Sequence, residues 1–235
     1  MNKLFNLDHI LIWVDKEAPE IELFKENGFT SIISGSHSQQ GTSGKYLFFL
    51  NFYIELLYIS DNVEAFENIE KFGCNYLERS YWRLNHASPF GLALKMKTFD
   101  KENILFDYTE YKADWMRDDG LIMADNNKNL LAPLVFVLRP KMEFPSYHSI
   151  DEMLIDNKPD DFKKNHIHEN GIKTLTSYHV YINPEAETSK LINYLNKSGI
   201  NILNGDENCI ELVFDNEINN RAFDFRPRLP LIIKY

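Results

Sequence analysis

Apolar residues recur along the chain in groups that predict a strand, a helix and further strands. In the first group, the dense apolar run at 7–14 (LDHILIWV) is typical of a buried strand. Apolar positions at helical spacing within 18–27 then predict a helix, which Gly28 ends. Further β-prone runs follow the helix and predict three strands, at 30–35, 45–50 and 52–59.

The same order returns twice, at a spacing of roughly 80 to 90 residues, which is the signature of an internal repeat. The second group predicts a strand, a short helix and two strands, at 90–97, 100–111, 120–125 and 129–140. The third predicts a strand, a helix and three strands, at 174–183, 186–199, 200–205, 208–216 and 228–235. We therefore predict an α+β fold of repeated βαβββ modules that form curved, partly closed mixed sheets.

Domain boundaries follow from how such modules bury their sheets. A four-stranded sheet with one helix covers only one face well, so modules must pair, and adjacency along the chain favours pairing the first with the second. We predict a two-module domain at 1–140 and a third βαβββ module at 173–235. The charged, proline-containing stretch at 141–172 is the expected connection.

Composition narrows the range of partners. The 25 Lys and Arg against 35 Asp and Glu give a formal charge of -10, so we expect no nucleic-acid partner. The apolar runs are too short to span a bilayer, and no leader-like segment opens the chain, so we expect no membrane association and a cytoplasmic location. The two cysteines, Cys74 and Cys209, form no CxxC motif and predict neither a disulfide framework nor a thiolate zinc site.

Two segments of the first group carry a family resemblance. GSHSQQGTSG, which precedes YIELL, and the opening LDHILIWV resemble the glyoxalase-like branch of the vicinal oxygen chelate superfamily. Shorter matches continue in SPFGLALKMKTFD, NLLAPLVFVLRP and HENGIKTLTSYHVYI, so the resemblance covers nearly the whole chain. It implies paired βαβββ modules around a cleft, where residues on the first and last strands of each module hold a divalent metal.

The resemblance places metal ligands at His9 and Glu55, whose imidazole and carboxylate would suit Zn, Fe, Mn or Ni. The second module offers no ligand at the matching positions. In the third module, His179 matches His9, but no carboxylate stands on the closing strand. A site of His9, Glu55 and His179 therefore requires the first and third modules to pair, and metal dependence stays open.

Strand alternation puts Tyr53, Glu55 and Leu57 on one face. Glu55 then faces either solvent or a cavity, where a raised pKa would let it act as a general base without a metal. His9 is either a hydrogen-bonded core histidine or a site residue. His37 is either exposed in a turn or, as the resemblance implies, lines the cleft; we expect Thr42 beside it there.

Two further groups are candidates of a more general kind. Trp82 and Tyr81 could form an aromatic wall over a small ligand, with Arg79 or Arg83 binding an anionic group, although aromatic residues are more often found in cores and interfaces. His166 and His168 stand two apart, but their segment is typical of a solvated turn.

We therefore predict a glyoxalase-like protein that binds a small organic molecule in a curved-sheet cleft. If it is an enzyme, the resemblance implies a metal-assisted isomerase, lyase or dioxygenase, with Glu55 as metal ligand or base. The alternative is a metal-free protein that binds or sequesters a small molecule without catalysis. An unpaired sheet edge of the odd module could also form a homodimer.

Overall fold

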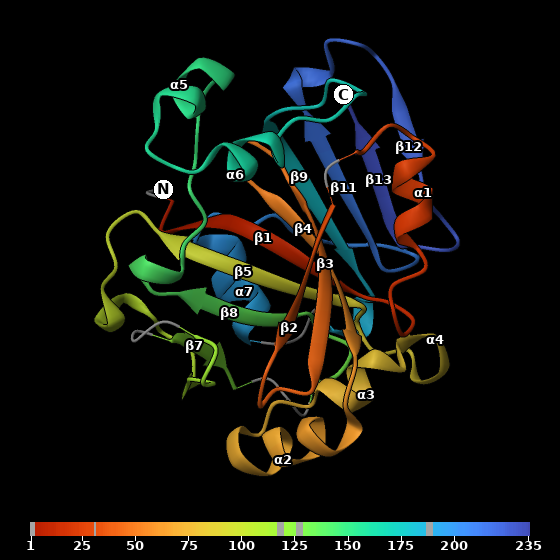
Figure 1. Cartoon of the computed structure of the whole chain (residues 1–235). Coiled ribbons are helices and arrows are strands. Elements are labelled where there is room, and N and C mark those ends of the chain that lie inside the picture. The colour runs from red at the N-terminus through yellow and green to blue at the C-terminus, as the bar shows by residue number, and fades with distance from the viewer. Residues whose placement is uncertain (1–2, 31, 117–119, 126–128, 187–189) are drawn as a thin grey trace.

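The computed structural model describes residues 3–30, 32–116, 120–125, 129–186 and 190–235. These residues form one eight-stranded and one five-stranded mixed sheet, with short helices around them (Figure 1). None of the described helices has the length and apolar character that a membrane crossing requires. Residue 31, in an expected strand, and residues 187–189, in an expected helix, lie outside the described residues.

The eight-stranded sheet consists of the first two modules. Its strand order is β2-β3-β4-β1-β5-β8-β7-β6, so each half repeats one pattern: β1 is parallel to β4, β5 is parallel to β8, and the halves meet at the antiparallel β1–β5 pair. The predicted α+β fold class is confirmed. The strands are β1 (Phe5–Trp13), β2 (Ile32–His37), β3 (Thr42–Phe48), β4 (Tyr53–Ile59), β5 (Phe90–Met96), β6 (Tyr108–Tyr111), β7 (Leu121–Ala124) and β8 (Leu134–Leu138).

The helices of the two modules differ. In the first, α1 (Ile21–Lys25) buries Ile21 and Phe24, and the Phe24 ring stacks on that of Phe225 at 4.6 Å. In the second, the expected helix at 100–111 is reduced to a 3₁₀ turn at Lys101–Asn103, and the residues after it form β6. Between the modules lie α2 (Asn62–Phe72), α3 (Tyr76–Ser80) and α4 (Trp82–Asn85).

The five-stranded sheet differs from the single βαβββ module predicted for 173–235. Its order is β10-β9-β11-β13-β12, with β10 parallel to β9 and β13 parallel to β11. Helix α7 supplies the crossover that a parallel β9–β10 pair needs, and β11 returns antiparallel on the other side of β9. The elements are β9 (Leu175–Ile182), α7 (Lys190–Lys197), β10 (Ile202–Asn204), β11 (Cys209–Phe214), β12 (Ala222–Asp224) and β13 (Leu231–Lys234).

One large core joins the two sheets. It lies on the outer face of the eight-stranded sheet, the face that carries Ile10 and Ile12, and continues into the inward residues of β9, β11 and β13. The rings of Phe49 and Phe214 meet at 4.5 Å across this boundary. Helix α7 lies behind β5 and β8 in Figure 1, and its Leu195 belongs to the same core. The opposite, inner face of the eight-stranded sheet carries a separate and smaller cluster of buried apolar residues.

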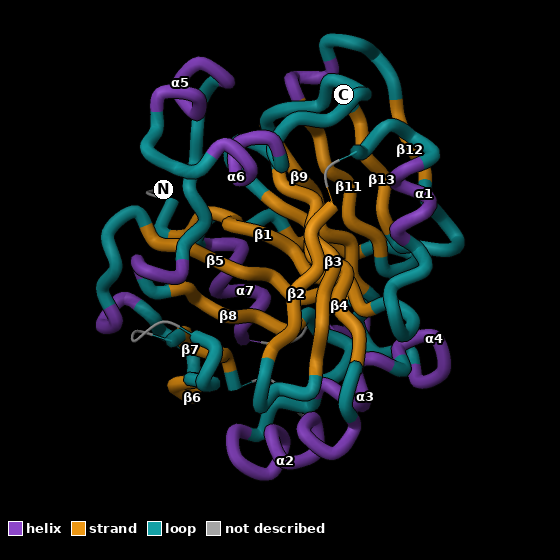
Figure 2. The backbone as a smooth tube through the Cα atoms, viewed as in Figure 1, coloured by secondary structure: helices purple, strands orange, loops and turns teal. Residues whose placement is uncertain are grey.

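The connection at 141–172 packs against the sheet and carries two short helices, α5 (Ile150–Ile155) and α6 (Asp160–Lys164) (Figure 2). His166 and His168 are 1% and 4% exposed, so the predicted solvated turn is wrong. The ring of Phe162 packs 4.6 Å from His166, and His168 Nε2 lies 3.0 Å from the carbonyl oxygen of Phe48. Phe48, which also stacks on His166 at 5.8 Å, is distant in sequence from both histidines, so the local pattern does not record this burial.

Candidate functional site

A β-bulge in β1 decides which way His9 points. Leu7 lies opposite Leu94 and His9 lies opposite Ala93, so Asp8 is an extra residue in the ladder. Regular alternation would put His9 on the outer face together with Leu7. The bulge reverses the alternation, so His9 joins the inner face.

The inner face encloses a cavity of about 130 Å³. Tyr53, Glu55 and Leu57 all line it, which confirms the predicted shared face of β4. Its other walls come largely from β1, β7 and β8 and from the loops around residues 115 and 142. The side chains of these walls are mostly apolar. The cavity is also lined by His9, Leu11, His37, Gln40, Tyr46, Tyr76, Trp115, Met116, Leu121, Met123, Leu134, Phe136, Leu138 and Met142.

Glu55 is the carboxylate of this cavity. It is 6% exposed, and its Oε1 atom has no hydrogen-bond partner among the described residues. Burial raises the pKa of Glu55 to about 7, against the opposing effect of a hydrogen bond from Tyr46. Room for the carboxyl comes from Gly44 on the neighbouring strand, where a Cβ atom would lie 2.7 Å from Oε1.

His37 lies beside Glu55 and is held from both sides. Its Nε2 atom lies 2.7 Å from the Tyr46 hydroxyl and 3.6 Å from Glu55 Oε1, and its Nδ1 atom lies 2.9 Å from Thr42 Oγ1. Burial, reinforced by the proximity of His9, lowers the pKa of His37 to about 4, so the ring is neutral at neutral pH. Thr42 therefore holds the side of the His37 ring that faces away from Glu55. Thr42 itself does not line the cavity, contrary to the prediction.

A hydrogen-bond network fixes Thr42 in turn. Gln40 Nε2 donates to Thr42 Oγ1 at 2.8 Å, and Gln40 Oε1 accepts from the Tyr111 hydroxyl at 2.9 Å. Asn68 of α2 donates to the Tyr111 oxygen at 2.8 Å. The polar wall of the cavity is thus held by α2 and β6, which lie far from β2 in sequence.

His9 is held by Asp8 and Tyr53. Its Nδ1 atom lies 2.8 Å from Asp8 Oδ1, and its Nε2 atom lies 3.1 Å from the Tyr53 hydroxyl, whose ring stacks on the imidazole at 4.0 Å. Because a carboxylate only accepts, Nδ1 carries the proton and Nε2 accepts from Tyr53. Burial lowers the pKa of His9 and keeps the ring neutral. Asp8 also faces Lys95 Nζ at 3.1 Å.

Trp82 and Arg83, predicted to bind the ligand, lie elsewhere. Trp82 Nε1 donates to the Trp13 carbonyl oxygen at 2.9 Å, and the Arg83 guanidinium covers the Trp82 ring at 4.5 Å. Arg83 pairs with Glu20 at 3.0 Å and Asp15 at 3.2 Å. Neither residue lines the inner cavity, so they do not join His37 and Thr42 in one site. An aromatic residue beside an arginine can make packing and ion-pair contacts on a surface helix, so this sequence pattern does not by itself indicate a ligand pocket.

The predicted metal site is not assembled either. His179 stands on β9 of the other sheet, where its Nδ1 atom faces Glu211 Oε1 at 3.6 Å. Across the described ranges, no three His, Cys, Asp or Glu side chains are placed to hold a metal ion. Both nitrogens of His9 are already engaged, by Asp8 and Tyr53. The residues present therefore do not fit the divalent metal that the resemblance implies.

Sequence reasoning missed several residues of the site. Tyr46 follows Thr42 and Gly44 by strand alternation, so its inward direction could have been found from the pattern of β3. Asp8 stands directly before His9, but the bulge that gives it a role has no local sequence signal. Trp115, whose ring lies 4.6 Å from that of His37, comes from a loop that no periodicity marks.

A family model and one solved structure support the architecture. Residues 7–103 match the family model of a glyoxalase-like domain. A crystal structure of a hypothetical protein from Staphylococcus aureus aligns over 98% of both chains with a TM-score of 0.58 at 13% identity, which is a likeness of fold. A xylose isomerase-like TIM barrel/4-hydroxyphenylpyruvate dioxygenase fusion protein aligns over 91% of this chain and 36% of its own, with a TM-score of 0.44 at 11% identity. No curated protein sequence matches the chain.

Proposed function

We propose that the inner cavity binds a small organic molecule through Glu55, on the premise that residues 7–103 match the family model of a glyoxalase-like domain. The molecule is about the size of one six-membered ring and presents a hydrogen-bond donor to the carboxyl group. The proposed binding uses no metal, because no three His, Cys, Asp or Glu side chains in the described part of the chain are placed to hold one.

The unpaired Oε1 atom of Glu55 carries this proposal. Buried polar atoms in proteins nearly always have a hydrogen-bond partner, because leaving one unpaired costs about 1 to 3 kcal/mol. Glu55 Oε1 is buried and unpaired among the described residues, yet it lies in the wall of a cavity. A donor that enters the cavity supplies the missing partner.

Size and lining define the rest of the ligand. A cavity of about 130 Å³ is close to the roughly 150 Å³ of an engineered apolar cavity that takes up benzene. Leu11, Leu134 and Phe136 present apolar surface, so the body of the ligand is apolar. Its donor group faces the side where Glu55 and His37 meet.

Phenol and toluene test the proposal, because they share a ring and differ in the donor. At pH 8.5, ligand-observed NMR should give phenol binding at least about fivefold tighter than toluene binding. Glu55→Gln keeps the shape but replaces a charged acceptor with a neutral one, and should remove most of that preference. Glu67→Gln, on the exposed face of α2, is the matched control and should change nothing.

Equal binding of the two compounds would overturn the proposal, and so would a phenol preference that survives Glu55→Gln. A ligand held only by the apolar wall would give the first result. A donor directed at another acceptor would give the second.

Proton transfer is the second candidate function, and one observation favours it. The pKa of Glu55, near 7, matches what a general base needs at neutral pH, and its neighbours His37 and Tyr46 are uncharged. On a ring-sized α-hydroxyketone, the carboxylate would remove the proton next to the carbonyl, leaving the electron pair as an enolate. The carboxylic acid would then return a proton to carbon.

Deuterium exchange measures this step directly. With 2-hydroxycyclohexanone in D₂O, the native protein should accelerate loss of the α-proton signal, with a half-maximal rate near pH 7. Glu55→Gln should abolish the acceleration. Binding of phenol without any exchange would leave a binding protein and exclude catalysis of this reaction.

A further inference from the structure

A second hollow adjoins the inner cavity. This groove has a volume of about 470 Å³ and opens more widely to solvent. Four side chains line both spaces, so the groove continues directly from the cavity: Tyr46, Tyr53, Trp115 and Met142. A ligand seated at Glu55 therefore has a path outward between these residues.

Aromatic rings form much of the groove. The rings of Phe48 and Phe144 stack at 5.3 Å with an interplanar angle of 8°. Tyr46 lies parallel to Phe48 at 5.9 Å and 5°, and the edge of Tyr53 meets Phe144 at 5.0 Å. These four residues are each only partly buried, so the aromatic array remains accessible to solvent. Exposed apolar surface gathered in a groove is typical of a binding site.

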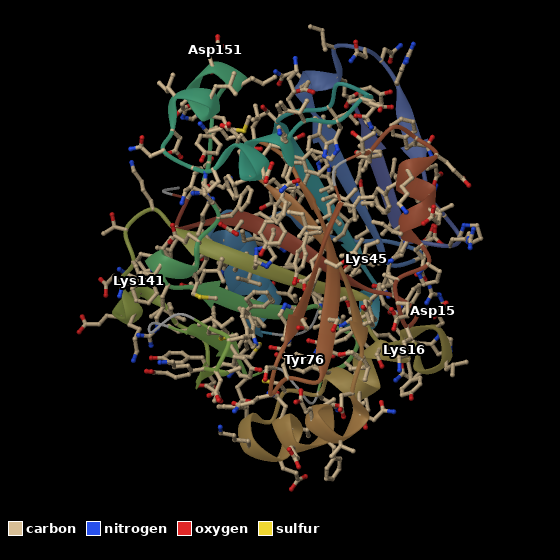
Figure 3. The ribbon with its side chains drawn as sticks, in the orientation of Figure 1. Asp15, Lys16, Lys45, Tyr76, Lys141 and Asp151 are labelled. Atoms are coloured by element: carbon tan, nitrogen blue, oxygen red, sulfur yellow. The ribbon has the colours of Figure 1, made fainter. Side chains whose placement is uncertain are left out.

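The connection supplies one wall of the groove, and buried groups fix that wall. The Phe144 backbone N–H donates to Asp8 Oδ2 at 3.0 Å, and the Phe144 ring stacks on His166 at 5.5 Å. The ring of Phe162 in α6 also contacts His166, at 4.6 Å. Lys141 marks the start of the same wall, after β8 (Figure 3). The ring array is therefore built into the fold at a point where the connection crosses the sheet.

We propose that the ligand is an aromatic compound of at least two rings, whose donor-bearing ring occupies the cavity while a second ring lies in the groove against Phe48 and Phe144. The inference rests on the proposed function, because it takes the donor at Glu55 as the fixed end. Aromatic rings prefer offset-stacked or edge-to-face partners, and such pairs add stabilisation beyond the area they bury. A planar second ring is therefore favoured over a saturated one of equal size.

Three probes separate the groove from the cavity: phenol, 4-benzylphenol and 4-(cyclohexylmethyl)phenol. Calorimetry on the full chain should give 4-benzylphenol about tenfold tighter binding than phenol, and about threefold tighter than the saturated analogue. Trp115, at the junction, reports the second ring: 4-benzylphenol should change tryptophan fluorescence in the native protein and much less in Trp115→Phe.

Phe144→Ala should remove the gain from the second ring and leave phenol binding within about twofold of native. Phe144→Leu keeps apolar volume while removing the ring, so it tests the same point if the alanine variant unfolds. Phe66→Ala, an exposed aromatic on α2 outside the groove, is the matched control and should leave all three affinities unchanged.

The outcomes distinguish the two proposals. Phenol binding with no gain from either extension overturns the groove inference and leaves the proposed function intact. Equal gains from the planar and saturated extensions overturn the aromatic class. Absence of binding by all three compounds overturns the proposed function and the inference together.

Discussion

Asp8 holds His9 in one tautomer and one direction. Oδ1 of Asp8 lies 2.8 Å from His9 Nδ1, while Oδ2 accepts the backbone N–H of Phe144 and faces Lys95. The same carboxylate thus fixes a residue of the cavity and a wall of the adjoining groove. Because Asp8 is the extra residue of the β1 bulge, the bulge both turns His9 inward and supplies its partner.

Asp8→Asn should destabilise the fold by about 3 kcal/mol. An asparagine side chain has one acceptor oxygen, so it cannot serve both His9 Nδ1–H and the Phe144 N–H, and Lys95 loses its ion pair. Denaturant unfolding measures the change. In the native protein, ¹⁵N chemical shifts should show His9 protonated at Nδ1.

Asp15→Asn is the matched control for this carboxylate. Asp15 pairs with Arg83 at the surface, and an exposed pair contributes about 1 kcal/mol or less. Equal stability of Asp8→Asn and the native protein would contradict the role assigned to Asp8, as would a native His9 protonated at Nε2.

Gly44→Ala should weaken phenol binding by about tenfold and cost about 1 to 3 kcal/mol of stability. The new Cβ atom would stand 2.7 Å from Glu55 Oε1, so the carboxyl must move from its place in the cavity wall. Ser43→Ala, one position earlier on β3 and directed to the opposite face, should leave binding unchanged. Native affinity in Gly44→Ala would mean that phenol does not contact this oxygen.

The sequence predicted those parts of the fold that depend on local pattern. Apolar strands around 7–14 and 52–59 brought His9 and Glu55 into one cavity, and strand alternation alone placed Tyr53 and Leu57 beside Glu55. The topology of β9–β13 could not be predicted in this way, because strand pairing is decided by contacts between distant segments. Repetition of strand and helix signals says which elements exist, but not which strands become neighbours.

The surroundings of three histidines depend on contacts that the local sequence pattern does not record. His9 reaches the cavity through a bulge whose extra residue looks like any other polar position in a strand. The local sequence predicts a solvated turn around His166, but the rings of Phe48 and Phe144, which are distant in sequence, stack on it in the structure. His179 matches His9 in local pattern, but it stands on a different sheet.

The stability of the fold should depend on pH through Glu55. Its pKa rises from 4.5 to about 7 on folding, so the folded state holds this proton more tightly. The resulting stabilisation is complete below about pH 4.5 and is lost as pH rises through about 7, by up to about 3 kcal/mol. The native protein should therefore lose stability relative to Glu55→Gln between pH 5 and pH 8.

The comparison with Glu55→Gln is needed because the stability contribution of His37 changes with pH in the opposite direction to that of Glu55. Its pKa falls from 6.5 to about 4, so its contribution is present above pH 6.5 and lost as pH falls toward 4. His37 is present in both proteins, and its contribution cancels in the difference. A difference that stays constant across pH 5 to 8 would contradict a raised pKa for Glu55.

Added metal should not stabilise the fold. His9 has both nitrogens engaged, and within the described ranges no three His, Cys, Asp or Glu side chains are placed to hold Zn²⁺, Mn²⁺ or Ni²⁺. A metal ion present at 100 times its Kd would raise the free energy of unfolding by about 2.7 kcal/mol. For a chain of this size, that corresponds to a rise of several degrees in Tm. Thermal unfolding at pH 7.5 with and without 1 mM metal should instead give the same Tm for the native protein, Glu55→Gln and His179→Gln. A metal-dependent rise in the native protein that disappears in Glu55→Gln would mean that Glu55 is a metal ligand after all, and that His9 leaves Asp8 or Tyr53 to join it.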